Sequence, residues 1–185
     1  SRAGKVEADK RKQQNERTHG QLFASMLGIE PGRPRLVLSE TLVQEARTRW
    51  GGPGALIGLN TGAGGRWISK GLDVERSVEL ARQLHSALGP GVRFLVLGGV
   101  LEADRNGRML ELLGEIEGLE VLDGGTGNGL LEFAAQVACC DVLVSSDSLA
   151  LHMAVALERP VVAFFAPTSG AEVDLFGRGR SLRSP

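Results

Sequence analysis

The sequence predicts an α/β fold in which a doubly wound parallel sheet of five or six strands follows a helical segment. Three observations support this prediction. Five short apolar runs alternate with stretches in which apolar residues recur every three or four positions. Continuous apolar runs are typical of parallel strands that helices cover on both faces. The length of 185 residues suits one domain with one additional segment.

Residues 1–54 are expected to form the helical segment, which joins the domain to whatever precedes it. A polar helix that becomes apolar toward its end is predicted over residues 5–27. A short extended piece at 35–38 leads to a second helix, which Ser39 caps and which runs to about Trp50.

Residues 55–177 are expected to form the domain itself. The apolar runs place strands at 55–59, 92–97, 119–122, 142–144 and 161–165, and the periodic stretches place helices at about 74–88, 102–115, 129–139 and 148–157. Right-handed crossovers between successive strands leave few topologies for such a chain. Residues 178–185 are expected to be a basic tail that is truncated, and the first methionine, Met26, suggests a fragment of a longer protein.

Composition and charge exclude several classes of protein. The formal net charge is −1, aromatic residues make up 4% of the chain and tyrosine is absent, so no nucleic-acid partner is expected. No apolar run approaches the roughly 18 residues of a transmembrane helix. The adjacent Cys139 and Cys140 have neither disulfide nor metal spacing, which favours a cytoplasmic location.

A local excess of positive charge marks residues 1–20, which carry six basic and three acidic side chains. A solvated basic helix is the simpler interpretation of this segment. A peripheral contact with anionic lipid headgroups at the inner membrane is the alternative.

Polar and glycine-rich loops follow every predicted strand. These loops begin at Asn60, Gly98, Gly124, Ser145 and Ala166. The carboxyl ends of parallel strands meet at one edge of a sheet, which is where α/β proteins bind their ligands. Ten of the 26 glycines lie in these five loops. The sequence therefore predicts a ligand site at this edge.

The residues in these loops suit a nucleotide diphosphate. Glycine-rich turns let backbone N–H groups approach a phosphate, and a helix that begins near Ser148 can face an anion. Lys70 supplies a cation for the phosphates, Glu102 can accept hydrogen bonds from ribose hydroxyls, and Asp147 can bind sugar hydroxyls.

Each of these residues also has a purely structural interpretation. The glycine run at 62–65 lacks the third glycine of a dinucleotide fingerprint, because Trp67 occupies that position, and it lacks the ending of a P-loop. Glu102 can be a helix-start carboxylate, Asp147 a helix cap and Asn128 a turn residue. Taken singly, each position fits a structural role, but their joint placement in the strand-end loops favours a site.

Four motifs in the same order and spacing resemble those of glycosyltransferase family 9, the ADP-heptose:lipopolysaccharide heptosyltransferase family. Residues 60–63 (N-T-G-A) with Lys70 are similar to its N-P-G-A…K segment, and residues 97–102 are similar to L-G-G-x-x-E. Residues 147–154 resemble D-[ST]-G-x-x-H-L-A, and residues 165–168 resemble F-G-P-T.

This resemblance implies a GT-B enzyme with two Rossmann-like domains, of which the chain matches the C-terminal, donor-binding half. It implies inverting, metal-independent transfer of a heptose from ADP-heptose to a lipopolysaccharide-core acceptor, with no cofactor and no metal. The acceptor and the catalytic base are expected in an N-terminal domain, so no catalytic residue is assigned in this sequence. The isolated chain is expected to be inactive.

The resemblance also assigns roles to the loop residues. The donor phosphates are expected to contact Thr61, Gly62, Ala63, Gly64, Lys70, Ser148 and Leu149, the ribose and base to contact Glu102 and Asn128, and the sugar-phosphate portion to contact Asp147 and His152.

Leu149 departs from the family pattern, because it stands where the motif has glycine. A side chain at this position bears on how closely a diphosphate can approach. Two alternatives therefore stay open: a degenerate, non-catalytic nucleotide-binding or scaffold module, and another GT-B enzyme that uses a different sugar nucleotide.

Overall fold

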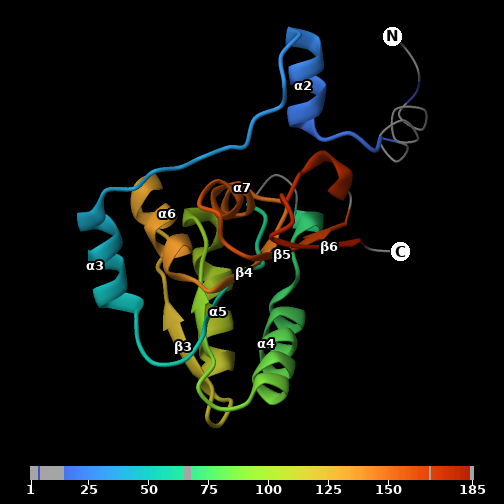
Figure 1. Cartoon of the computed structure of the whole chain (residues 1–185). Coiled ribbons are helices and arrows are strands. Elements are labelled where there is room, and N and C mark those ends of the chain that lie inside the picture. The colour runs from blue at the N-terminus through green and yellow to red at the C-terminus, as the bar shows by residue number, and fades with distance from the viewer. Residues whose placement is uncertain (1–3, 5–14, 65–67, 167, 184–185) are drawn as a thin grey trace.

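The computed structural model describes residue 4 and residues 15–64, 68–166 and 168–183, and these form an α/β domain built on a six-stranded sheet (Figure 1). The sheet order is β3-β2-β1-β4-β5-β6, and all neighbouring strands are parallel. The strands are β1 (Leu56–Asn60), β2 (Arg93–Val96), β3 (Glu120–Asp123), β4 (Val142–Ser146), β5 (Val161–Phe165) and β6 (Gly179–Arg183). The predicted doubly wound, Rossmann-like sheet is thus confirmed.

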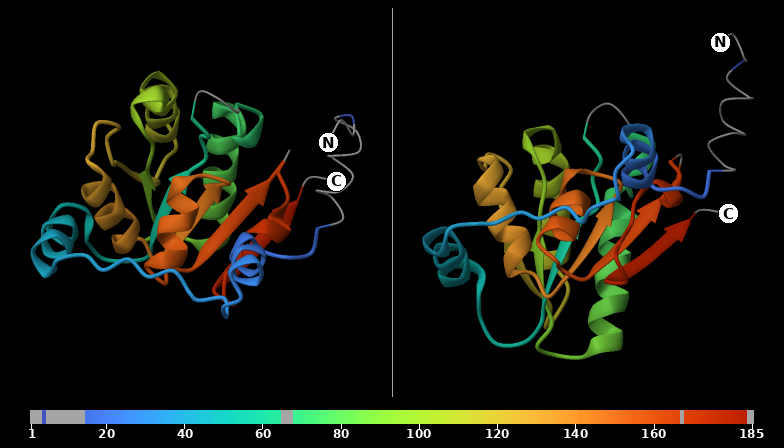
Figure 2. Two further views of the ribbon diagram at one scale, coloured as in Figure 1. Left: turned by 90° about the horizontal axis from the view of Figure 1, so that it is seen from above. Right: turned by 45° about the horizontal axis from the view of Figure 1, so that its top comes forward.

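Helices cover both faces of this sheet (Figure 2). The helices α4 and α5 pack together on one face, and α6 contacts both α3 and α7 on the other. The α-helices are α2 (His19–Leu27), α3 (Glu40–Trp50), α4 (Val74–Leu88), α5 (Ala103–Gly114), α6 (Leu130–Cys139) and α7 (Leu149–Ala156), and the 3-10 turns are η1 (Ile68–Lys70), η2 (Val100–Glu102) and η3 (Gly170–Glu172). No helix among the described residues is long and apolar enough to cross a bilayer.

The core divides into two layers because side chains alternate along each strand. In β2, Phe94 and Val96 pack with Met109 and other residues of α4 and α5, whereas Leu95 joins Leu143 on the α6 and α7 side. Burial on both faces explains why the central strands are continuously apolar rather than alternating.

The first described helix is shorter than the sequence predicts. Residues 15–18 are not helical, and Thr18 caps α2 through a capping box in which Gln21 N donates to Thr18 Oγ1 at 3.1 Å and Thr18 N donates to Gln21 Oε1 at 2.9 Å. Residues 5–14 of the predicted 5–27 helix lie outside the described residues. The predicted cap at Ser39 is confirmed, because its hydroxyl accepts a hydrogen bond from Leu42 N. Residues 35–38 form no strand.

The predicted basic tail is corrected by the structure, because its described part belongs to the sheet. Residues Gly179–Arg183 form β6, which pairs with β5 from Val161 opposite Gly179 to Phe165 opposite Arg183. All five residues of β6 are exposed. Their sequence, G-R-S-L-R, has no apolar pattern from which this edge strand could be predicted. The sheet therefore extends beyond residue 177.

The order of the strands reverses between β1 and β4. From β1 the chain crosses through α4 to β2, and from β4 it crosses through α7, on the opposite face, to β5. The loops that leave the carboxyl ends of these two neighbouring strands diverge, and such a divergence opens a crevice for a ligand.

The tight packing around β1 can be tested at Gly58. A Cβ at Gly58 would lie 2.7 Å from Cys140 Sγ and 2.9 Å from Leu143 Cδ1. We expect Gly58→Ala to lower the free energy of unfolding, measured by urea denaturation, by about 2 kcal/mol, because the added methyl overpacks the core. Gly107→Ala in α5 is the control. No atom lies within 4 Å of its added Cβ, and it should gain up to about 1 kcal/mol from helix propensity. Similar effects of the two substitutions would contradict this account of the core.

Candidate functional site

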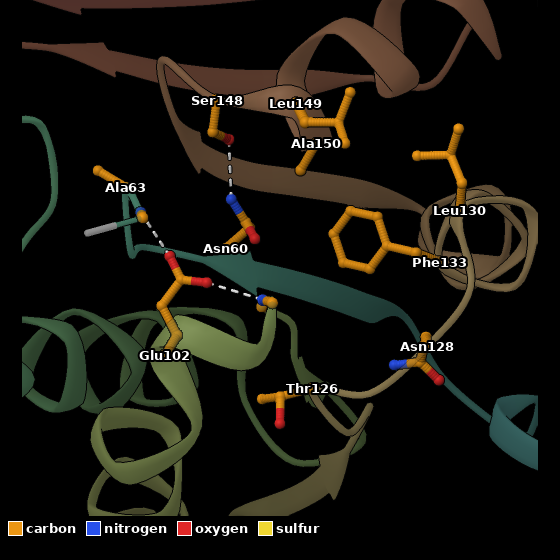
Figure 3. A pocket seen from close by; sticks show the side chains of 13 residues that line it. Asn60, Ala63, Glu102, Thr126, Asn128, Leu130, Phe133, Ser148, Leu149 and Ala150 are labelled. Atoms are coloured by element: carbon orange, nitrogen blue, oxygen red, sulfur yellow. Dashed lines mark hydrogen bonds between the residues drawn. The ribbon is translucent and has the colours of Figure 1, made fainter. Parts of the chain in front are cut away.

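A pocket of about 370 Å³ opens at the carboxyl edge of the sheet, where the sequence predicts a ligand site (Figure 3). Loops that follow β1, β2, β3 and β4 contribute to it, together with the first turns of α6 and α7. Its lining consists of Asn60, Ala63, Gly64, Gly98, Gly99, Glu102, Thr126, Asn128, Leu130, Phe133, Ser148, Leu149 and Ala150. None of the described residues that follow β5 lines it.

One wall of the pocket is a cluster of hydroxyl and amide groups at the ends of β1 and β4. Asn60 Nδ2 donates to Ser148 Oγ at 2.9 Å and to Ser145 Oγ at 3.3 Å, and the two serine oxygens lie 3.1 Å apart. The register of the strands, with Asn60 opposite Ser145, brings these groups together.

The N-terminus of α7 borders the same wall. Ser148 is its N-cap residue, but the Ser148 hydroxyl bonds to Asn60 and makes no capping hydrogen bond to the helix. The first backbone N–H groups of α7 therefore have no side-chain acceptor from their cap. Such an end carries partial positive charge and can accept an anion.

Glu102 joins two glycine turns across the pocket. Its Oε1 accepts a hydrogen bond from Gly64 N, and its Oε2 accepts one from Gly99 N, both at 2.7 Å (Figure 3). A Cβ at Gly62 would lie 2.6 Å from Glu102 Oε1, so glycine is required for the close approach of the loop to this carboxylate. Glu102 thus shapes the pocket, and each oxygen still has a lone pair for a ligand hydroxyl.

Lys70 and Asp147 form an ion pair beside Ser148. Lys70 Nζ lies 2.7 Å from Asp147 Oδ2, and less than one fifth of either side chain is exposed (19% and 17%). Burial by itself raises the pKa of the Asp147 carboxyl. The hydrogen bond and positive charge of Lys70 help to outweigh burial, so this pKa lies below its ordinary value of 3.8. The ammonium keeps further N–H donors for a ligand.

The opposite wall of the pocket is apolar. The Phe133 ring of α6 points into the cavity toward Asn60, with Leu130 beside it and Leu149 and Ala150 of α7 across from it (Figure 3). Leu149 is 55% exposed and lines the pocket. This wall offers a flat surface for an aromatic ring, and Thr126 and Asn128 supply polar groups at its edge.

Several of the predicted site residues are placed away from this pocket. The side chain of Thr61 is fully buried, and its hydroxyl accepts hydrogen bonds from Arg105 and Ser77, so it does not line the pocket and its contact with the donor stays a prediction. Gly62 lies against the Glu102 side chain and does not line the pocket. Lys70 and Asp147 flank the pocket without lining it. Trp67, which stands at the position of the third glycine of a dinucleotide fingerprint, lies outside the described residues.

His152 is also separated from the main pocket. It lies one turn after Ser148 but is exposed, and it lines a second cavity of about 680 Å³ between α7, η3 and the segment around α2. In that cavity His19 Nε2 lies 3.6 Å from Glu172 Oε2. The role of His152 toward a sugar phosphate stays a prediction.

Asn128 combines the two roles that the sequence suggests. Its Nδ2 donates to the carbonyl oxygens of Gly124 and Gly125, which fixes the turn after β3, and its side chain also lines the pocket. A contact of this residue with a base stays a prediction.

Sequence reasoning missed other lining residues, chiefly Asn60, Thr126, Leu130 and Phe133. Asn60 had a usable signal, because it is the first polar residue after an apolar strand. Leu130 and Phe133 had none, because apolar residues in a helix are normally assigned to the core.

The fold and the position of the pocket define a Rossmann-like α/β domain with a pocket at its topological switch point, where α/β proteins bind their ligands. The family model for glycosyltransferase family 9 (heptosyltransferase) matches residues 5–179. The chain therefore belongs to glycosyltransferase family 9, as its motifs indicate. No protein with a curated description matches the sequence significantly.

Solved structures of this family share the fold. E. coli ADP-heptose LPS heptosyltransferase II superposes with a TM-score of 0.65 and 24% identity, over 83% of this chain and 46% of that one. A glycosyltransferase family 9 protein from Veillonella parvula gives 0.71 and 19%, over 92% and 50%. E. coli heptosyltransferase WaaC with ADP-2-deoxy-2-fluoro heptose gives 0.58 and 23%, over 89% and 47%. The chain spans about half the length of these structures.

The depressed pKa of Asp147 predicts a pH-dependent contribution to stability. A carboxyl whose pKa is lower in the folded than in the unfolded protein stabilises the fold above its ordinary value of 3.8, and this contribution is lost as the pH falls through the folded-state value. We expect Asp147→Asn to lower the free energy of unfolding at pH 7 by about 2 kcal/mol. The difference from wild type should shrink as the pH falls from about 5 to about 3. The control is Asp104→Asn, at an exposed position, and a difference that does not change with pH would contradict the assignment.

Proposed function

We propose that this domain binds the nucleotide-sugar donor of a glycosyltransferase that moves a heptose from ADP-heptose to a lipopolysaccharide-core acceptor, with inversion and without a metal ion. The observation that carries the proposal is the convergence on one cavity of three features: a glycine loop, an uncapped helix N-terminus and an apolar wall. Family membership supports the same class of donor.

Each portion of a nucleotide sugar has a matching surface in the pocket. The base fits between Phe133 and Leu149, where apolar contact area is offered on two sides. Glu102, held rigid by two backbone N–H groups, presents its remaining lone pairs to the ribose hydroxyls. The diphosphate then lies toward Ser148 at the N-terminus of α7, within reach of the flexible Lys70 side chain.

The contribution of these residues to the reaction is stabilisation of the leaving group. In an inverting transfer the acceptor hydroxyl oxygen attacks the anomeric carbon, the bond from that carbon to the diphosphate oxygen breaks, and a base removes the hydroxyl proton. Negative charge then develops on the nucleoside diphosphate. Lys70 and the N-terminus of α7 supply positive charge there, which is the role a metal ion fills in other transferases.

The rest of the reaction is proposed to need a second domain. The solved structures that share this fold are about twice as long as the chain. We place the acceptor and the catalytic base in such a second half, so the 185 residues alone should bind donor without turning it over. We also propose that the protein acts in the cytoplasm, at the face of the inner membrane.

Calorimetric titration with ADP tests the donor site. We expect saturable binding to the wild-type chain and about tenfold weaker binding for both Lys70→Ala and Glu102→Ala, a loss of about 1.4 kcal/mol each. Arg82→Ala is the matched control, because Arg82 pairs with Glu79 on the exposed surface of α4. Absence of binding at millimolar ADP would overturn the proposal. A thermal-shift comparison of ADP, UDP and GDP decides the nucleotide, and a preference for UDP would favour another GT-B sugar-nucleotide enzyme.

The position of the Leu149 side chain supports one alternative function, a non-catalytic module. Its side chain stands at the N-terminus of α7, where a diphosphate would lie, and it is more than half exposed. If this side chain excludes the diphosphate, the domain is a non-catalytic nucleotide-binding or scaffold module.

Leu149→Ala separates the two functions. If Leu149 forms part of the base-binding wall, removing its methyl groups should weaken ADP binding about fivefold through lost apolar contact. The scaffold alternative predicts the opposite: no binding by wild type, and binding that appears in the variant. Leu131→Ala, at a similarly exposed leucine of α6 outside the pocket lining, controls for a general effect of losing a surface leucine.

A further inference from the structure

We propose that Arg105 is a positioning residue that holds the two described ends of the glycine loop, residues 61–64 and 68–72, in the arrangement that binds the donor. This inference rests on the proposed function, because the loop carries Gly64 at the pocket and Lys70 beside it. Arg105 lies on α5, outside the four motifs that indicate the family, and it does not line the main pocket.

The Arg105 guanidinium joins both ends of the loop. Its Nη2 donates to Thr61 Oγ1 at 2.7 Å, where the loop begins, and to Leu72 O at 2.8 Å, where it ends. The same nitrogen donates to Ser77 Oγ at 2.9 Å in the first turn of α4. Leu72 N donates in turn to Thr61 O at 2.9 Å and closes the base of the loop. One side chain thus connects the end of β1, the loop and α4.

Little space remains at this base for another arrangement. A Cβ at Gly71 would lie 2.9 Å from Thr61 O, so the two ends of the loop are in close contact. Behind the loop is a cavity of about 250 Å³, which is lined by Gly62, Leu72, Glu102 and Arg105 among others. Arg105 lines this cavity and also donates to Ser77 of α4, so without its guanidinium the base of the loop would lose its link to that helix.

The electrostatic setting of Arg105 also points to positioning. No carboxylate among the described residues makes an ion pair with it, and its acceptors on the loop and on α4 are neutral. Burial lowers the pKa of Arg105, although the charges of Glu102 and Asp73 oppose this. A half-buried cation with neutral partners costs free energy, and what Arg105 contributes is geometry: a single guanidinium nitrogen, Nη2, shares its two hydrogens among three acceptors.

Arg105 acts together with Glu102, which precedes it by one helical turn. Glu102 holds the loop at Gly64, and Arg105 holds it at Thr61 and Leu72. The start of α5 therefore fixes three points of the loop. Because Lys70 is two residues before Leu72, the fixed base sets the place from which its side chain reaches Asp147 and the phosphates.

Amide hydrogen exchange without ligand tests the contact itself. Arg105→Met, which keeps the apolar stem, should speed exchange of the Leu72 and Gly64 amides at least tenfold while the amides of β1 and β4 stay protected. Arg105→Lys should do the same, because the lysine side chain ends one bond short of the position of Nη2, and it serves if the Met variant does not fold. Arg108→Ala, at an exposed arginine of the same helix that pairs with Glu111, should change neither. Unchanged exchange at Leu72 would overturn the inference.

A double-mutant cycle with ADP tests whether Arg105 acts through Lys70. Arg105→Met should weaken ADP binding about tenfold, and Lys70→Ala in that background should add no more than about twofold. A merely structural loss of stability would leave the two effects independent, so a full further tenfold loss would overturn the positioning role. If wild type binds no ADP, the proposed function fails, whereas the exchange experiment still decides whether Arg105 holds the loop.

Discussion

The parallel pairing of β1 with β4 is the constraint on which the rest of the structure depends. It joins the two halves of the sheet and places Asn60 opposite Ser145, so that the amide and hydroxyl groups at the two strand ends meet. Because the crossovers from these strands pass on opposite faces, their loops diverge and leave a crevice above the pairing. Every other part of the candidate site, including the α7 N-terminus, is built around that crevice.

The charged groups of the site are held in place by contacts within the protein. Glu102 is fixed by two backbone N–H groups, Lys70 is paired with Asp147, and Arg105 joins the ends of the glycine loop. Each of these interactions restricts a loop that glycine would otherwise leave with many conformations. Restricting a loop in this way lowers the part of a ligand's interaction energy that is lost in ordering the protein.

Local sequence patterns predicted most of the elements but not the details of the site. The helix α4 was predicted with its observed ends, because Asp73 caps it and an apolar stripe runs along its length. The exposed strand β6 and the break at Thr18 carry weak patterns and were missed. Thr61 was placed in the site by its motif, but a threonine beside a pocket can turn its side chain to either side of the backbone, and here it turns inward to Arg105.

The sequence by itself determined the fold class, the family and the edge of the sheet at which a ligand would lie. It could do so because helix and strand periodicity, glycine placement and motif spacing are properties of short segments. Only the tertiary structure decided that Phe133 faces Leu149 across the pocket, that His152 belongs to a different cavity, and that Arg105 supports the loop. These relations join residues far apart in the chain or on different helix faces, and they follow from strand order and packing, which no local pattern specifies.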